Sequence, residues 1–205
     1  MGFYDEKILP RFINLACSSK PTTKQREKIV PRAEGDVLEI GFGSGLNVPY
    51  YDKQKVRKVF GLEPSEGMRK LAADKVAESE IDIEFIDLPG DEIPLDANSV
   101  DTVLVTYTLC TIPNVAAALE GMRRVLKPGG VLLYCEHGKA PDASVLRWQN
   151  RLNPAWEKIG GGCNINRDIP ALIEDNGFII TSDERMYVPG PRILSYNFWG
   201  SADAR

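Results

Sequence analysis

Residues 37–45 hold the feature of the sequence that most constrains the fold. The segment Val37-Leu38-Glu39-Ile40-Gly41-Phe42-Gly43-Ser44-Gly45 is a short apolar run with one acidic residue, followed by three glycines at alternate positions. Such an apolar run is typical of a strand buried in a parallel sheet. The glycines suit a tight turn whose backbone approaches a ligand closely, because no Cβ stands in the way. We therefore expect a buried strand that ends in a ligand-binding turn.

Strand and helix signals alternate along the chain after this segment. Apolar runs predict strands at 37–40, 56–62, 83–86, 100–106, 131–135, 178–181 and 193–198, with helices between them. Alternation of this kind builds a parallel sheet with helices on both faces. We therefore predict an α/β fold, a Rossmann-like doubly wound sheet of seven mainly parallel strands. A length of 205 residues suits one such domain.

Polar residues and glycines mark where the helices begin and end. Thr22 or Thr23 is a candidate cap for a helix that Pro31 ends, and Ser65 and Asn114 are candidate caps for two later helices. The helix after Asn114 is expected to end at residues 127–130, where a glycine can adopt a left-handed cap.

A long helix is expected over residues 142–159. One face of this helix carries the apolar residues Val145, Trp148, Leu152, Trp156 and Ile159. This pattern favours packing of that face against the core. The alternative is that Trp148 and Trp156 form an aromatic wall for an apolar ligand.

Composition excludes several classes of function. The net charge of -4 and the pI near 5.2 argue against a nucleic-acid surface. The apolar runs fall short of the roughly 20 residues that a membrane span needs, so we expect no stable membrane insertion. The four cysteines form no CxxC pair, which predicts reduced thiols in a cytoplasmic protein. With a single histidine we expect no metal site. Nothing in the sequence indicates an oligomeric state.

Candidate ligand groups follow the first strand, where the ligand of an open parallel sheet binds. The amides of Gly41, Gly43 and Gly45 are placed to contact the amino-acid part of a nucleoside ligand. Glu39 can hold an ammonium, directly or through water, and Asn47 lies just beyond the turn.

Further candidates follow the next three strands. Glu63 can accept hydrogen bonds from two ribose hydroxyls, and Gly90 and Asp91 can contact an adenine edge. Thr106 and Tyr107, after the fourth strand, are expected beside the reacting centre. A glycine turn with an acid about 20 residues further on is typical of a nucleotide-binding Rossmann fold.

Two other interpretations remain open. A nicotinamide-dependent reductase would have GxGxxG, but the third glycine position here holds Leu46, and Tyr107, the tyrosine expected beside the reacting centre, has Thr111 and not lysine four residues on. The chain could also bind its nucleoside ligand without turnover. Calorimetry with competing ligands separates these two interpretations.

The sequence resembles class I S-adenosylmethionine-dependent methyltransferases, also described as type 11 methyltransferases. The likeness rests on residues 39–45, Gly61-Leu62-Glu63-Pro64-Ser65, Asp101 and Val125-Leu126-Lys127-Pro128-Gly129-Gly130. A closer likeness, to the methyltransferase-like 7 proteins, rests on Cys135-Glu136-His137, Trp148-Gln149, Asn153-Pro154-Ala155-Trp156, Gly162-Cys163-Asn164 and Arg167. That family includes membrane-anchored alkyl-thiol S-methyltransferases, whereas this sequence shows no hydrophobic N-terminal anchor.

The resemblance implies a single class I methyltransferase domain over residues 1–205. Its parts would be a helical segment or lid at 1–34, a cofactor-binding core at 35–136, a substrate-side insertion at 137–177 and C-terminal strands at 178–205. The implied cofactor is S-adenosylmethionine, bound by Glu39, Gly41, Gly43, Asn47, Glu63 and the Gly90-Asp91 turn. The implied acceptor is a small, fairly apolar molecule, with methylation of thiol sulfur or amine nitrogen favoured.

Catalytic candidates are few. His137 is the one side chain whose ordinary pKa suits a general base near neutral pH, although it could instead tie down the loop after the fifth strand. Tyr107 is the alternative and could line the methyl path. For Cys163, which has no histidine near it in the sequence, we favour packing or a loop role over nucleophilic chemistry. Phe3 and Tyr4 are candidates for an N-terminal lid.

Overall fold

The computed structural model describes residues 9–205, so the lid predicted at Phe3 and Tyr4 lies outside the described residues. The strands are β1 (Gly35–Ile40), β2 (Val56–Leu62), β3 (Asp82–Ile86), β4 (Val100–Thr106), β5 (Leu126–His137), β6 (Phe178–Tyr187) and β7 (Tyr196–Ala204). The helices are α1 (Leu9–Cys17), α2 (Lys20–Ile29), α3 (Glu66–Ala77), α4 (Val115–Val125), α5 (Ala143–Ile159) and α6 (Ile169–Asp175), with short 3₁₀ turns η2 (Val30–Arg32) and η3 (Val48–Tyr50).

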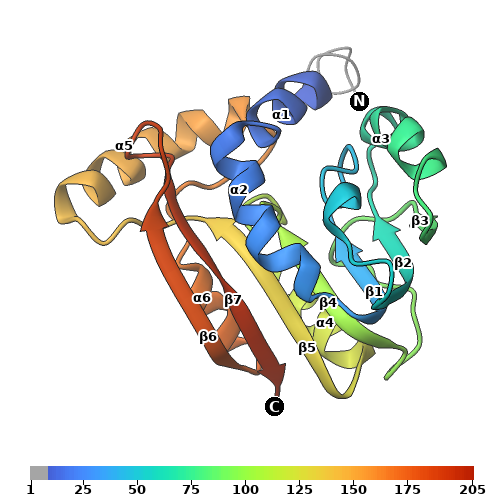
Figure 1. Ribbon diagram of the computed structural model, residues 1–205. Helices are drawn as coiled ribbons and strands as arrows, with labels where there is room; N and C mark the ends of the chain where they lie inside the picture. The colour runs from blue at the N-terminus through green and yellow to red at the C-terminus, as the bar shows by residue number, and fades with distance from the viewer. Residues whose placement is uncertain (1–8) are drawn as a thin grey trace.

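The strands form one sheet in the order β3-β2-β1-β4-β5-β7-β6 (Figure 1). Strands β1 to β5 pair in parallel, and β7 pairs antiparallel with both β5 and β6. This topology confirms the prediction of seven mainly parallel strands. The chain leaves β1 toward β2 and β3 and then returns to place β4 on the other side of β1. The carboxyl ends of β1 and β4 therefore form the switch point at which ligands bind in such sheets.

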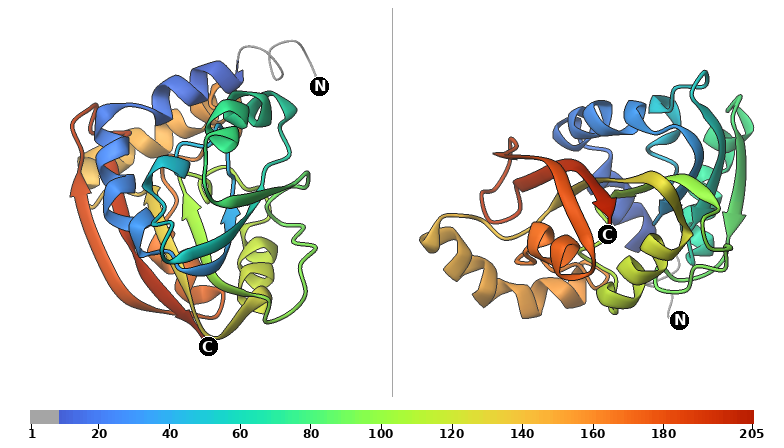
Figure 2. Two further views of the ribbon diagram at one scale, coloured as in Figure 1. Left: turned by 45° about the vertical axis from the view of Figure 1, so that its right-hand side comes forward. Right: turned by 90° about the horizontal axis from the view of Figure 1, so that it is seen from below.

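Helices cover both faces of the sheet, as the unbroken apolar runs predict. Val103 and Val105 of β4 pack with α4 and α6, whereas Leu104 faces the opposite layer with α2 and α3. Figure 2 shows α2 on one side of the sheet and α4 and α6 on the other. None of the helices described between residues 9 and 205 combines the length and the apolar character that a membrane crossing requires.

Two of the predicted helix caps are confirmed. The Ser65 side chain accepts a hydrogen bond from the Met68 amide, and Asn114 accepts one from the Ala117 amide. The prediction for α2 is wrong, because the helix begins at Lys20, after Ser19. The Thr22 hydroxyl instead donates to the carbonyls of Cys17 and Ser19, 2.8 and 2.7 Å away.

The predicted glycine cap after α4 is also wrong. Leu126 follows the helix with extended backbone angles, φ -64° and ψ 131°, and pairs at once with Val100 of β4. Residues 127–130 belong to β5, and Gly129, with φ 81°, lies within the strand. Sheet pairing therefore overrides the local turn signal. Antiparallel pairing likewise carries β6 to Tyr187 and β7 to Ala204, beyond the predicted ends.

The predicted packing face of α5 is wrong. Trp148 is 56% exposed and Ile159 is 55% exposed, whereas the buried residues of the helix are Gln149 and Asn153. Gln149 Oε1 accepts a hydrogen bond from the Ala140 amide at 2.9 Å, and its Nε2 donates to the Ile165 carbonyl at 2.8 Å. The helix is therefore anchored by polar contacts to the loops around it, which a pattern of apolar residues does not reveal.

We expect Gln149→Leu to lower the free energy of unfolding by about 1–3 kcal/mol for each buried backbone group that it leaves without a partner. The control is Trp148→Gln on the exposed side of the same helix, which should change the stability by no more than about 0.5 kcal/mol. Urea unfolding of both variants measures the difference. A larger loss for Trp148→Gln than for Gln149→Leu would contradict this orientation of α5.

Candidate functional site

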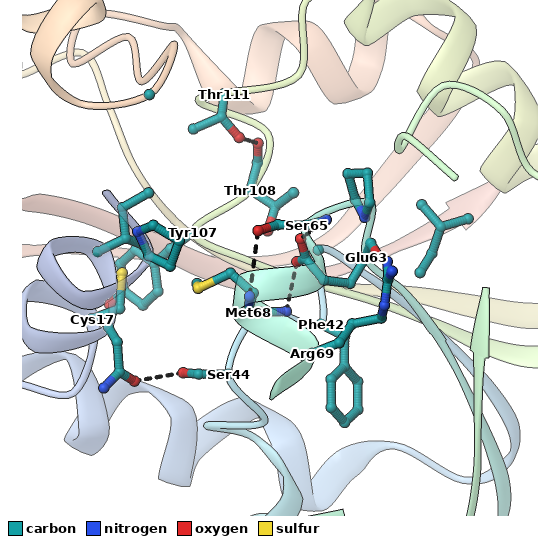
Figure 3. A pocket seen from close by; sticks show the side chains of 18 of the residues that line it. Cys17, Phe42, Ser44, Glu63, Ser65, Met68, Arg69, Tyr107, Thr108 and Thr111 are labelled. Atoms are coloured by element: carbon teal, nitrogen blue, oxygen red, sulfur yellow. Dashed lines mark hydrogen bonds between the residues drawn. The ribbon is translucent and has the colours of Figure 1, made fainter. Parts of the chain in front are cut away.

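A cavity of about 890 Å³ opens at the carboxyl ends of β1, β2 and β4. The glycine turn after β1, the start of α3 and the loop after β4 line it, and α1 closes one side through Leu9, Ile13, Asn14 and Cys17. Figure 3 shows Glu63 and Arg69 on one side of this cavity and Cys17 and Tyr107 on the other. Apart from Gly45 and His137, all the candidate site residues from the sequence line it.

Each of the three turn glycines has a positive φ: 69° at Gly41, 60° at Gly43 and 70° at Gly45. A Cβ on Gly41 would lie 2.3 Å from Thr108 Oγ1, whereas a Cβ on Gly43 would meet nothing closer than Met68 Cε at 3.5 Å. The backbone at Gly43 is therefore open to a ligand. Gly45 packs against Ala72 of α3 and does not line the cavity. Its place favours a role in helix packing over the predicted ligand contact.

Glu39 is a buried carboxylate at the base of the cavity. Its Oε1 accepts a hydrogen bond from Asn47 Nδ2 at 2.8 Å, and its Oε2 accepts one from the Tyr51 hydroxyl at 2.6 Å. Burial raises the pKa of Glu39 to about 7. Asn47 Nδ2 also donates to Thr106 Oγ1 at 3.0 Å, which joins the ends of β1 and β4. The residues predicted at these two strand ends thus form one network.

Glu63 joins the end of β2 to the glycine turn. Its Oε2 accepts a hydrogen bond from the Gly43 amide at 2.8 Å, and its Oε1 accepts one from the Ser65 amide at 2.9 Å. A carboxylate oxygen has more than one lone pair, so each oxygen can accept a further donor from the cavity. Burial raises the pKa of Glu63 above its ordinary value.

The predicted adenine-side turn lies at the far end of the cavity. Gly90 and Asp91 line it together with Asp87, whose carboxylate pairs with Arg69 at 2.6 Å. A Cβ on Gly90 would lie 3.0 Å from Ile112 and 3.1 Å from Ile40. The turn therefore packs closely on apolar side chains.

Tyr107 has an uncommon backbone. Its φ is 55°, a conformation that bulky side chains rarely adopt and that costs of order 1–3 kcal/mol. Its amide donates to the Cys135 carbonyl at 2.9 Å, and its hydroxyl donates to Asn197 Oδ1 at 2.7 Å. Burial raises the pKa of the hydroxyl well above its usual range. These contacts hold the ring at the cavity wall, as predicted. The hydroxyl proton of Tyr107 is used in the hydrogen bond to Asn197.

Nothing in the sequence indicated two cavity residues near Tyr107, which are Arg26 and Cys17. Arg26 of α2 is 4% exposed, and its guanidinium lies 5.0 Å from the Tyr107 ring centroid. Its Nη1 donates to the Cys17 carbonyl at 2.7 Å, whereas its buried Nε has no partner within residues 9–205. Arg26 sits in a strongly polar helix sequence that resembles an exposed surface. Only the tertiary contact with the sheet shows that it is buried.

The structure separates His137 from the cavity. Its ring stacks with Tyr107 at a centroid distance of 6.3 Å, and its Nε2 lies 3.3 Å from Cys163 Sγ. The position disagrees with a base in contact with a ligand, because the Tyr107 ring and not the imidazole lines the cavity. The alternative from the sequence, a histidine that ties down a loop, agrees with the Cys163 contact. Sequence spacing could not show that a histidine faces Cys163.

Comparisons with known proteins agree with the cofactor side of the cavity. Residues 38–134 match the model of the Methyltransferase domain family named Methyltransf_11. Thiol S-methyltransferase TMT1B of Homo sapiens is 33% identical over 85% of this chain and 78% of that protein. Thiol S-methyltransferase TMT1A of Homo sapiens is 31% identical over 72% of this chain and 62% of that protein.

Solved structures share the fold at lower identity. One of them is a chain from the complex between the Haloferax volcanii Trm112 methyltransferase activator and the putative methyltransferase. It superimposes on this chain with a TM-score of 0.71 and is 18% identical, and the match covers 96% of this chain and 93% of that chain. A methyltransferase of Thermotoga maritima, titled a possible histamine N-methyltransferase, gives a TM-score of 0.67 with 20% identity and coverage of 98% and 99%.

Proposed function

We propose that this chain, which belongs to the class I S-adenosylmethionine-dependent methyltransferase family, methylates the sulfur of a small apolar thiol. S-adenosylmethionine is the methyl donor of the family. The single observation that carries the choice of acceptor is the Arg26 guanidinium, which is buried without a carboxylate partner within residues 9–205 and lies beside an apolar part of the cavity. The names of human TMT1A and TMT1B, both thiol S-methyltransferases, point the same way.

The residues at the strand ends fit the cofactor. The open backbone at Gly43 leaves room for the amino-acid part of the cofactor beside the turn amides. Buried Glu39 is placed to hold its ammonium, with Asn47 and Thr106 fixing the carboxylate. Glu63 supplies acceptors for the ribose hydroxyls, and Gly90 and Asp91 flank the adenine position.

The acceptor end of the cavity favours an anionic nucleophile. Leu9 and Ile13 of α1, with Tyr107, supply apolar walls. No carboxylate within residues 9–205 forms an ion pair with Arg26. Its charge therefore lowers the pKa of a nearby thiol and repels a protonated amine. This asymmetry supports sulfur over nitrogen, the second acceptor that the sequence left open.

The reaction then needs little more than position and exclusion of water. Bound S-adenosylmethionine supplies a methyl group on a sulfonium, which is transferred to the thiolate sulfur as the old carbon–sulfur bond breaks and its electron pair stays on the donor sulfur. Arg26 holds the acceptor as thiolate, so that the thiol proton leaves to solvent before transfer. Tyr107 and α1 exclude water, which favours a step that neutralises charge. Positioning of this kind can lower a barrier by roughly 7–11 kcal/mol.

Family membership sets aside the nicotinamide-dependent reductase. Binding without turnover is tested directly by a labelled-methyl screen over small alkyl thiols, amines, phenols and phospholipid headgroups. We expect transfer to apolar thiols above the other classes. Transfer to amines or phenols in preference to thiols would refute the acceptor assignment. Cofactor binding with no transfer to any class would support the binding module.

The ribose assignment predicts that Glu63→Gln weakens binding of S-adenosylhomocysteine about ten- to hundredfold. Hydrogen bonds to a charged acceptor are worth about 1.5–3 kcal/mol, which corresponds to that range. The matched control is Glu80→Gln, whose exposed carboxylate pairs with Lys53 at 2.7 Å and does not line this cavity. Calorimetry measures both. Equal affinities for the two variants would contradict the assignment.

The Glu39 assignment predicts a pH dependence of cofactor binding. The pKa of Glu39 in the free protein is about 7, so below that pH the carboxyl is protonated and must lose its proton to pair with an ammonium. The dissociation constant of S-adenosylhomocysteine should therefore rise roughly tenfold per pH unit below 7 and level off above it. Glu39→Gln should bind weakly with no such slope. An unchanged slope in the variant would assign the titration to another group.

The role of Arg26 predicts a shift in the pH profile of thiol methylation. In Arg26→Gln the thiol loses a nearby positive charge, so the rise of kcat/KM with pH should move up by about one unit. Arg26→Lys, which keeps the charge, should shift the profile less. An unmoved profile in Arg26→Gln would show that the guanidinium has only a structural role.

A further inference from the structure

A second cluster of chemically active side chains lies behind the wall formed by Tyr107. We propose that Cys110, His137 and Cys163 form a binding site for one thiophilic divalent cation, with zinc as its natural type. This proposal does not rest on the identity of the methyl acceptor. It opposes our expectation from the sequence that the chain holds no metal, which depended on the single histidine.

The donor atoms have the spacing of ligands around one ion. The two cysteine sulfurs and a ring nitrogen of His137 all lie within 4.8 Å of one another, and Cys163 Sγ is 3.3 Å from His137 Nε2. Zinc bonds of about 2.3 Å to sulfur and 2.0–2.1 Å to nitrogen, at tetrahedral angles, separate ligands by roughly 3.5–3.8 Å. Small side-chain shifts therefore suffice to surround a cation.

Three distant segments bring these donors together, and a polar network holds the segments in place. Cys110 follows β4, His137 ends β5, and Cys163 follows α5. The Asn164 amide donates to the Cys110 carbonyl at 2.8 Å, and Asn153 Nδ2 donates to Asn164 Oδ1 at 2.8 Å. The site is thus organised before any ion binds.

The chemistry of the donors suits a cation. Both thiols are free, and cysteine thiolate is the form that binds a metal ion. Two thiolates and one neutral imidazole balance a divalent charge. Buried Nδ1 of His137 and Oε2 of the adjacent Glu136 have no partner within the described residues, which leaves polar groups beside the cluster for further contacts.

Two cysteines alone would also allow a disulfide, but the convergence of the imidazole on both sulfurs favours a cation. Three protein ligands leave a fourth position for water or another small ligand. The segments so joined carry Tyr107 and Gly161, which both line the cavity. A bound cation would therefore fix the wall of the acceptor end.

The test uses the full chain, reduced and freed of metal, titrated with Co²⁺ as a spectroscopic probe and then with Zn²⁺. We expect one Co²⁺ per chain, with thiolate-to-cobalt absorption and the intense visible bands of tetrahedral coordination, and displacement by one Zn²⁺. Removing a group that is only hydrogen-bonded to a metal ligand typically lowers metal affinity about 10–100-fold, and removing the ligand itself should cost at least as much. Cys163→Ser and His137→Asn, which each remove a ligand, should therefore weaken cobalt binding by about a hundredfold or more.

The matched control is Cys135→Ala, which removes a buried cysteine of β5 outside the cluster and should leave the cobalt spectrum unchanged. Circular dichroism shows whether each variant is folded. If one of the two ligand variants does not fold, Cys110→Ser is used in its place, because it also removes a ligand. Absence of thiolate-to-cobalt absorption, or equal binding by the ligand variants and the control, would overturn the proposal. So would a Cys110–Cys163 disulfide that forms readily in a protein with no affinity for either ion.

Discussion

The hydrogen bond from the Gly43 amide to Glu63, at 2.8 Å, joins the ends of β1 and β2, and the cofactor side of the cavity depends on it. The amide can point at the carboxylate only because the turn has left-handed backbone angles at Gly41 and Gly43, which glycine adopts without strain. The hydrogen bonds from Asn47 to Glu39 and Thr106 likewise join the ends of β1 and β4. Three strand ends are thereby held around one space before a ligand enters.

The two ends of the cavity are built by different means. The proposed cofactor end uses backbone amides and carboxylates at the ends of parallel strands. The proposed acceptor end is lined by helix α1, the strained Tyr107 and buried Arg26, which come from the N-terminal segment and the loop after β4. Variation in the acceptor end can therefore change the substrate and leave the cofactor contacts intact.

The seven mainly parallel strands, and the meeting of the glycine turn with Glu63 at the strand ends, could be predicted from the sequence because their signals are local. The apolar run, the glycines and Glu63 lie in short segments, and their positions follow from sheet topology alone. Three other features could not be predicted, because each depends on which distant segment packs beside it. These are the burial of Arg26, the inward face of α5 and the contact between His137 and Cys163. Gln149 shows this most clearly, since its burial is explained by carbonyls at residues 138 and 165.

A crystal structure of the chain grown with S-adenosylhomocysteine tests the central claim most directly. The account predicts the ligand in the cavity after β1, with its ribose hydroxyls on Glu63 and its ammonium beside Glu39. A ligand bound elsewhere, or an empty cavity at saturating S-adenosylhomocysteine, would contradict it.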